Sequence, residues 1–171
     1  IKLKEKLIAP LKPRLDQSLS LGNEGAGVVV DAGSEAKEMI GKTVGLAGGG
    51  MYCQYRCMPA NNCLLMDDQT SPEEAASSFV NPMTALGFIE TMKLEGHEAL
   101  IHTAASSNLG QMLIKICKTD SVPLINIVRN SSQIELFKNV GANFVCSTSD
   151  ENFKEDLFTS IKETGATLAF D

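Results

Sequence analysis

Short apolar runs alternate with longer amphipathic segments from about residue 98 to residue 171. Four of these runs have the length and composition of buried strands: residues 99–102, 124–128, 144–146 and 167–170. Strands that alternate with helices are typical of parallel sheets with right-handed crossovers. The order therefore predicts an α/β fold with a doubly wound parallel sheet of four strands.

The three segments between these strands have the patterns of helices. The first shows the i, i+3, i+4, i+7, i+8 spacing of a helix that lies on a sheet, with Leu109, Met112, Leu113, Ile116 and Cys117. The second is predicted to begin at Ser132 with Glu135 in the capping-box position, and to bury Ile134, Phe137 and Val140. The third begins near Asp150 and turns three apolar residues inward, Phe153, Leu157 and Ile161.

The first 70 residues have a different character, because short β-branched or aromatic runs are joined by glycine turns. Strands are predicted at residues 25–32, 43–47 and 52–58. A helix should start at Ser71, since Ser71-Pro72-Glu73-Glu74 places a cap, a first-turn proline and a capping-box glutamate in order. We therefore divide the chain into a partial β-rich domain, residues 1–75, and a partial α/β domain, residues 76–171.

Charge and cysteine content narrow the classes of function. The net charge of -6 disfavours nucleic-acid binding, since Lys and Arg are nowhere clustered for contacts with phosphates. No apolar run approaches the roughly 18 residues that cross a bilayer. Five cysteines, an odd number and not arranged in paired C-x-x-C motifs, fit a reducing compartment. We expect a cytoplasmic protein that acts on a small molecule and binds neither nucleic acid nor membrane.

The turn after the first strand of the parallel sheet is the place to look for a ligand, because doubly wound sheets bind at the carboxyl ends of their strands. Small residues there let a backbone approach a diphosphate, and the following helix offers free N–H groups. The candidate binding residues are Ala105, Ser106, Ser107, Asn108, Leu109 and Gly110. Ala105 and Ser107 replace the first two glycines of a strict G-x-G-x-x-G fingerprint, so a turn that holds no ligand is the alternative.

The end of the second strand indicates which dinucleotide would bind. NAD-binding units usually place Asp or Glu about 20 residues past the loop, to hold the ribose hydroxyls. Arg129 stands there instead, followed by Asn130 and Ser131. A fixed cation with nearby hydroxyls suits a 2′-phosphate, so we predict NADP(H), with Arg129 and Ser131 as binding residues. The alternative is that Arg129 only solvates the end of a strand.

With these residues in view, the chain resembles the medium-chain dehydrogenase/reductase superfamily, in particular its quinone reductases and enoyl-thioester reductases. The resemblance spans about residues 20–171 and rests on four segments: 22–27 (GNEGAG), 80–85 (VNPMTA), 105–110 (ASSNLG) and 138–143 (KNVGAN). It implies part of a GroES-like catalytic domain, followed by part of an NADP(H)-binding Rossmann domain. It also implies a catalytic role for Asn81, a position for Thr84 beside the nicotinamide, and a homodimer.

Several departures from the superfamily's pattern bear on the chemistry. Zinc-dependent members carry a metal-ligand His where this chain has Asn23 and a ligand Cys near Val80, so no zinc is expected. Enoyl-thioester reductases use a tyrosine ahead of the GNEGAG segment, whereas Tyr52 and Tyr55 are the only tyrosines here. Tyr52 is the candidate proton donor. Alternation would put the two rings on opposite faces of a strand, so at most one could face the cleft, and the sequence favours a core role for each.

We therefore expect a zinc-independent reductase that transfers hydride from NADPH to a quinone, an enone or an enoyl thioester. A dinucleotide-binding module without turnover, or an inactive fragment of such a reductase, is the alternative, and a zinc alcohol dehydrogenase is a third possibility. The resemblance implies a sheet of about six strands, of which four are present. We expect the 171 residues to be a fragment or an incomplete record, an expectation that a native mass of 18.3 kDa would remove.

Overall fold

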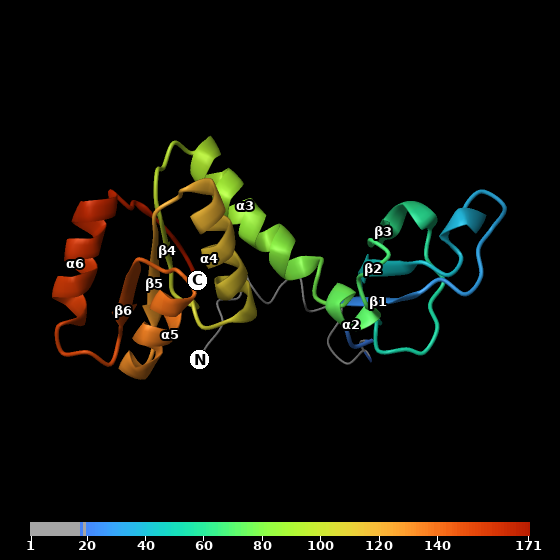
Figure 1. Cartoon of the computed structure of the whole chain (residues 1–171), viewed down its shortest axis with the longest axis horizontal. Helices are drawn as coiled ribbons and strands as arrows, with labels where there is room; N and C mark the ends of the chain where they lie inside the picture. Colours follow the sequence, from blue (N-terminus) through green and yellow to red (C-terminus); the bar gives the residue numbers. More distant parts are fainter. Residues whose placement is uncertain (1–17, 19) are drawn as a thin grey trace. The chain divides into compact units, whose positions relative to one another are not determined.

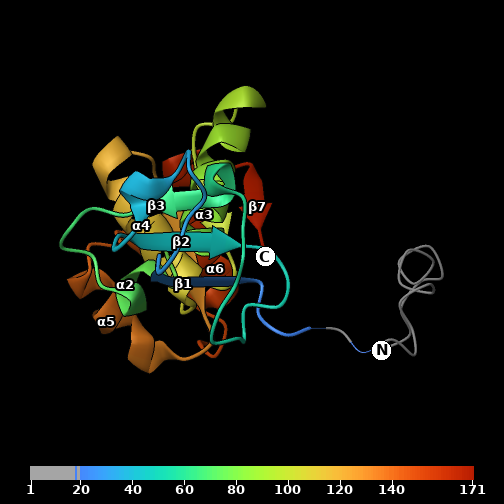
Figure 2. The same ribbon diagram turned by 90° about the vertical axis from the view of Figure 1, so that its right-hand side faces the viewer.

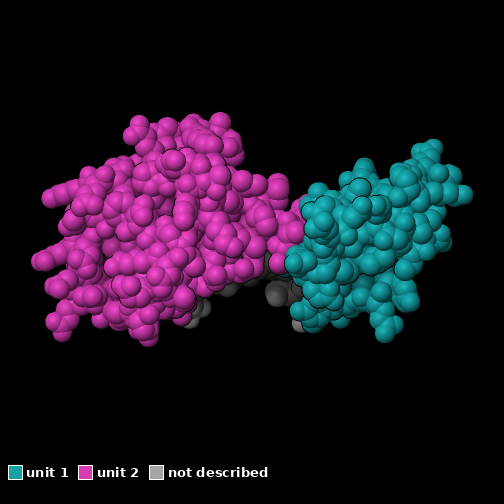
Figure 3. All heavy atoms as spheres, viewed as in Figure 1, with its two compact units in different colours: residues 1–76 teal, residues 77–171 magenta. Residues whose placement is uncertain are grey.

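The computed structural model describes Ser18 and residues 20–171, and it separates the chain into two compact units. Unit 1 is Ile1–Ala76 and unit 2 is Ser77–Asp171 (Figure 3). The division falls where a short helix of unit 1 ends and the chain continues into the long first helix of unit 2. Each unit therefore has its own secondary structure and its own sheet.

Unit 1 contains an antiparallel sheet in the order β1-β2-β3 (Figure 2). Its strands are β1 (Glu24–Val28), β2 (Thr43–Ala47) and β3 (Cys63–Leu65), with 3₁₀ turns η2 (Lys37–Met39) and η3 (Ala60–Asn62) in the connections. The strand predicted at residues 52–58 is wrong, because this segment is irregular. A tight bend, in which the amide of Cys53 donates to the Met51 carbonyl at 2.9 Å, turns the backbone away from an extended path.

The helix predicted at Ser71 is confirmed, with both halves of its capping box. The Ser71 hydroxyl accepts from the amide of Glu74 at 3.3 Å, and the Glu74 carboxylate accepts from the amide of Ser71 at 3.0 Å. This helix, α2 (Pro72–Ala75), is a single turn. A short non-helical segment separates it from the next helix, α3 (Val80–Leu94), near the start of unit 2. Pro82 lies in the first turn of α3, where proline is tolerated.

Unit 2 is built on a parallel sheet of four strands in the order β6-β5-β4-β7 (Figure 1). The strands are β4 (Leu100–His102), β5 (Leu124–Val128), β6 (Phe144–Ser147) and β7 (Leu168–Phe170). All three pairings are parallel, and each strand lies within one residue of its predicted bounds. The predicted parallel sheet is confirmed.

Helices cover both faces of this sheet. On one face α3, α4 (Asn108–Asp120) and α5 (Ile134–Asn139) enclose a core that includes Ala85, Leu113 and Phe137. On the other face α6 (Phe153–Thr164) packs its inward residues against Ile125 and Cys146, as Phe153, Leu157 and Ile161 were predicted to do. The doubly wound α/β class is therefore confirmed.

Two details of the helices differ from the sequence prediction. The buried face of α4 is Gly110, Leu113, Ile114 and Cys117, rotated by about one position from the predicted stripe because α4 packs along α3 as well as on the sheet. The second helix has no capping box at Ser132: it starts at Ile134 after the 3₁₀ turn η4 (Ser131–Gln133). Val140 is 42% exposed, because the helix ends at Asn139.

Candidate functional site

The loop between β4 and α4 forms a turn that leads directly into the helix. Ser107 is the N-cap of α4, and its hydroxyl accepts from the amide of Gly110 at 3.0 Å. The Ser107 carbonyl accepts from the amide of Gln111 at 3.1 Å, which starts the helical ladder. The first amides of the helix, those of Asn108 and Leu109, precede that ladder and have no carbonyl acceptor within it. They are available to an anion at the positive end of the helix dipole.

Gly110 lets α4 pack closely against this turn. A Cβ on residue 110 would lie 2.3 Å from the carbonyl oxygen of Ala105 and 2.7 Å from its Cα, distances that no side chain tolerates. Ala105 itself is fully buried, so its backbone has no room to retreat. The packing therefore requires glycine at this position, as the last glycine of a dinucleotide fingerprint is required.

The other two fingerprint positions do not need glycine here. Within residues 103–110 no backbone φ angle is positive. Ser107 adopts an ordinary extended conformation with φ -71° and ψ 164°, which is also the conformation of a helix N-cap. Side chains at Ala105 and Ser107 are therefore compatible with a loop whose backbone still turns closely at the end of β4.

Arg129 and Ser131 lie just beyond the carboxyl end of β5, on the same edge of the sheet as the loop. Arg129 is exposed, and among the described residues no carboxylate forms an ion pair with it. The Ser131 hydroxyl lies 3.1 Å from that of Ser149, which follows β6. This edge therefore carries an arginine without an ion pair among the described residues, two residues before a serine whose hydroxyl contacts that of Ser149.

Ser147 and Ser149 were missed by the sequence reasoning. Ser147 ends β6 and is buried, and its hydroxyl lies 3.0 Å from that of Ser149. The signal was present, because the carboxyl end of a third parallel strand beside β5 must reach the same edge of the sheet.

His102 ends β4 immediately before the loop and is enclosed in the core. Only 2% of its surface is exposed, and its ring lies 6.0 Å from that of Phe88, which stacks on Phe170 at 3.9 Å. Burial lowers the pKa of His102, and the nearby Asp171 carboxylate opposes this more weakly. The next residue, Thr103, donates from its hydroxyl to the Asp171 carboxylate, which joins the start of the loop to the end of β7.

Asn81 and Thr84 lie in the first turns of α3, and both are half-buried. The Thr84 hydroxyl donates to the Val80 carbonyl at 2.7 Å within the helix. A short connection joins the end of α3 to the start of β4, so the helix runs back along the strand and begins toward the carboxyl edge of the sheet (Figure 1). The structure thus carries these two residues in the same unit as the loop, and their catalytic role stays a prediction.

Comparisons with known proteins point to one superfamily. Over 140 residues the chain is 30% identical to a mitochondrial enoyl-acyl-carrier-protein reductase of Caenorhabditis elegans, covering 78% of the chain and 40% of the reductase. The crystal structure of a candidate NADPH:quinone reductase from Mesorhizobium loti matches 86% of the chain and 45% of its own length, with 30% identity and a TM-score of 0.74. The chain belongs to the medium-chain dehydrogenase/reductase superfamily.

A third likeness concerns the fold alone. A mycobacterial protein solved in complex with NADPH matches 98% of the chain and 53% of its own length, at 20% identity and a TM-score of 0.69. The chain thus spans about half the length, or less, of these superfamily members. No protein-family model matches the chain.

Within Ser18 and residues 20–171, no group of three or more His, Cys, Asp or Glu side chains is arranged to hold a metal ion. The cysteines are all unpaired thiols, and burial raises the pKa of Cys117 to about 12. No helix in the described part of the chain combines the length and apolar character of a membrane span.

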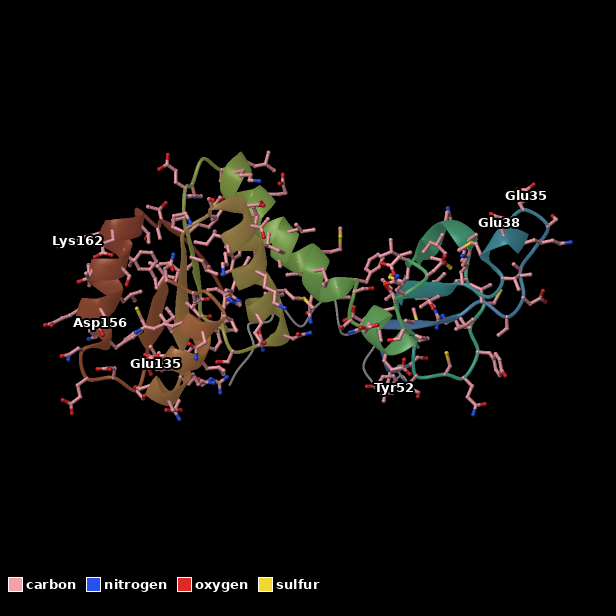
Figure 4. All side chains as sticks on the ribbon, viewed as in Figure 1. Glu35, Glu38, Tyr52, Glu135, Asp156 and Lys162 are labelled. Carbon is pink, nitrogen blue, oxygen red and sulfur yellow. The ribbon has the colours of Figure 1, made fainter. Side chains whose placement is uncertain are left out.

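Tyr52 and Tyr55 both lie in the irregular segment of unit 1. Their exposed fractions are 82% and 79%, so the core role that the sequence favoured for each is wrong. The prediction that the two rings lie on opposite faces of a strand is also wrong, because these residues are not in a strand. Figure 4 shows the Tyr52 side chain at the surface of unit 1. Its role as a proton donor stays a prediction.

Proposed function

We propose that the chain is the NADP(H)-binding part, with a portion of the catalytic domain, of an oxidoreductase. It would transfer hydride from NADPH to a quinone or to an α,β-unsaturated carbonyl compound such as an enoyl thioester. The observation that carries the proposal is the contact of Gly110 with Ala105, because such close approach of helix and loop is what a dinucleotide fold requires of its fingerprint. The enoyl and quinone reductases among the similar proteins support the same reading.

The residues at the carboxyl edge fit the cofactor. The amides of Asn108 and Leu109 would hold the diphosphate, with Ala105, Ser106 and Ser107 forming the close backbone. Arg129, which has no carboxylate partner in the described chain, would pair with a 2′-phosphate, and Ser131 would add a hydroxyl. The reduced nicotinamide supplies the hydride, while the protein supplies position and electrostatics.

The remaining catalytic parts belong to the same proposal. Asn81 and Thr84 would line the nicotinamide end of the site, and Tyr52 would supply a proton during reduction of an enoyl thioester. A quinone makes weaker demands, because its reduced form can take a proton from water. The absence of a ligand set at Asn23 and Val80 supports chemistry without zinc. Five unpaired thiols support a reducing, cytoplasmic location, and a homodimer is carried over from the superfamily resemblance.

Stopped-flow oxidation of NADPH tests this function. The protein is mixed with NADPH and either a quinone or an enoyl thioester, and absorbance of the reduced nicotinamide is followed. Hydride transfer to at least one acceptor is expected. Tight NADPH binding with no oxidation by either acceptor would instead support a binding module without turnover, an alternative favoured by the exposure of Tyr52.

A further inference from the structure

Three serine hydroxyls form a chain at the carboxyl edge of the sheet. Ser147 ends β6 and is 2% exposed, Ser149 follows it in the next turn, and Ser131 follows β5. The Ser149 hydroxyl lies 3.0 Å from that of Ser147 and 3.1 Å from that of Ser131. One hydroxyl therefore joins the ends of two neighbouring strands.

Backbone amides hold the same three residues in place. The amide of Ser131 donates to the Ser149 hydroxyl oxygen at 3.3 Å, and the amide of Ser149 donates to the Ser147 hydroxyl oxygen at 3.3 Å. The amide of Thr148 donates to the Val128 carbonyl at 2.9 Å, which ties the two strand ends together one step earlier. The segment that carries Arg129 is thus anchored on both sides, at Val128 by the backbone and at Ser131 by the Ser149 side chain.

The donors and acceptors in this chain can be counted. Each serine hydroxyl has one proton and can accept two hydrogen bonds. If Ser147 donates to Ser149 and Ser149 donates to Ser131, the Ser131 hydroxyl keeps its own proton for an external acceptor. This polarity satisfies every hydrogen bond among the three serines, and the donor that remains free stands two residues from Arg129, which has no ion pair in the described chain. A phosphate, whose negatively charged oxygens accept hydrogen bonds, is the ligand that such a donor and cation suit.

The acidic side chain that follows Ser149 along the chain takes part in the next turn. The Asp150 carboxylate accepts from the amide of Asn152 at 3.0 Å, which stabilises the turn into α6. Its backbone amide donates to the Ser147 carbonyl at 3.1 Å. One oxygen of the carboxylate is therefore held in the turn before α6.

We propose that Ser149 is a positioning residue for nucleotide selection. Its hydroxyl holds Ser131 against β6, orients the Ser131 hydroxyl as a donor, and so keeps that donor and Arg129 together at the 2′-phosphate. This inference rests on the proposed NADP(H) function. Ser149 would not contact the nucleotide itself and would act through the Ser131 hydroxyl.

Dissociation constants for NADPH and NADH, measured for Ser149→Ala, test the proposal. NADPH affinity should fall about five- to tenfold, the scale of one or two lost hydrogen bonds, while NADH affinity changes less than about twofold. Ser149→Thr keeps the hydroxyl and should restore the NADPH preference. Ser160→Ala is the matched control, because the Ser160 hydroxyl donates to the Asp156 carbonyl at 2.8 Å within α6, which covers the opposite face of the sheet, and should change neither constant.

Amide hydrogen exchange without nucleotide gives an independent readout. The Ser131 amide should exchange faster in Ser149→Ala than in the wild type, because its acceptor is removed. An unchanged ratio of NADPH to NADH affinity in Ser149→Ala, or equal losses in the Ala and Thr variants, would overturn the positioning role. A wild-type protein with no preference for NADPH would contradict the proposed function itself, so the two failures are distinguishable.

Discussion

Two glycine-bearing loops, one in each unit, are held in opposite ways. The loop from Thr103 to Gly110 is fixed by packing, with Ala105 fully buried and Gly110 in contact with it. The segment that follows Gly48-Gly49-Gly50 leaves Tyr52 and Tyr55 almost fully exposed. The first loop is a preformed backbone surface, whereas side chains of the second have few neighbours within the described residues.

This difference separates binding from chemistry. A diphosphate needs backbone amides at a fixed place, and the first loop provides them through contacts within unit 2 alone. Proton donation needs a side chain held at a definite distance from substrate, whereas the Tyr52 side chain is 82% exposed in the described part of unit 1. The described structure therefore supports nucleotide binding more directly than proton donation. Substitutions in the two loops test this difference.

The largest effect is expected for Gly110→Ala. The added Cβ would overlap the backbone of the buried Ala105, so the free energy of unfolding should fall by about 3 kcal/mol or more, and nucleotide binding should weaken with it. Chemical denaturation and NADPH titration measure the two effects. Gly87→Ala is the matched control, because a Cβ at that helical glycine in α3 meets nothing within 4 Å and should stabilise the fold by about 0.5–1 kcal/mol. Equal effects of the two substitutions would refute the close-packing argument.

Arg129→Ala should weaken NADPH binding by about 1.5–3 kcal/mol, the scale of hydrogen bonds to a charged group. NADH, which lacks the 2′-phosphate, should bind nearly as before. Calorimetric titration of both nucleotides provides the comparison. Losses of the same size for the two nucleotides would remove Arg129 from the 2′-phosphate site.

Ser107→Ala removes the N-cap of α4 and should lower the free energy of unfolding by about 1 kcal/mol. Ser107→Asp is a sharper variant, because aspartate caps a helix as well as serine but brings a negative charge to the proposed diphosphate site. Its stability should match the wild type while its NADPH affinity falls. Unaltered affinity in Ser107→Asp would place the diphosphate elsewhere.

The smallest effect is expected in the other loop. Tyr52→Phe should change the free energy of unfolding by less than about 0.5 kcal/mol, because the side chain is 82% exposed and makes no core contact that the hydroxyl supports. Thermal denaturation measures it. A decrease in the free energy of unfolding as large as that of Ser107→Ala would show that the segment after Gly50 is held as firmly as the loop before α4. The proposed difference between the two loops would then be wrong.

The sequence predicted the parallel sheet well, because each of its strands is a compact apolar run between helices with clear periodicity. The bounds of β5, Leu124–Val128, follow from the composition of that segment alone. The same reasoning failed at residues 52–58, where aromatic and polar residues mimic a strand but a bend at Met51–Cys53 redirects the backbone. The short strand β3 was missed, since three residues carry too little pattern to be recognised.

The sequence likewise predicted only some of the residues of the candidate site. Gly110 and Arg129 could be found from spacing along the chain, since the loop follows the first strand and the charge follows the second. The need for glycine only at residue 110, and not at residues 105 or 107, depends on φ angles and on contact with Ala105 that spacing does not contain. Ser149 is a tertiary neighbour of Ser131 across 18 residues, so its place became clear only once the order of β5 and β6 was known.

The structure of the protein with NADPH bound tests the central claim most directly. We expect the diphosphate within hydrogen-bond distance of the amides of Asn108 and Leu109, and the 2′-phosphate beside Arg129 and Ser131. A dinucleotide bound away from the turn between β4 and α4, or a 2′-phosphate with no contact to Arg129, would contradict it.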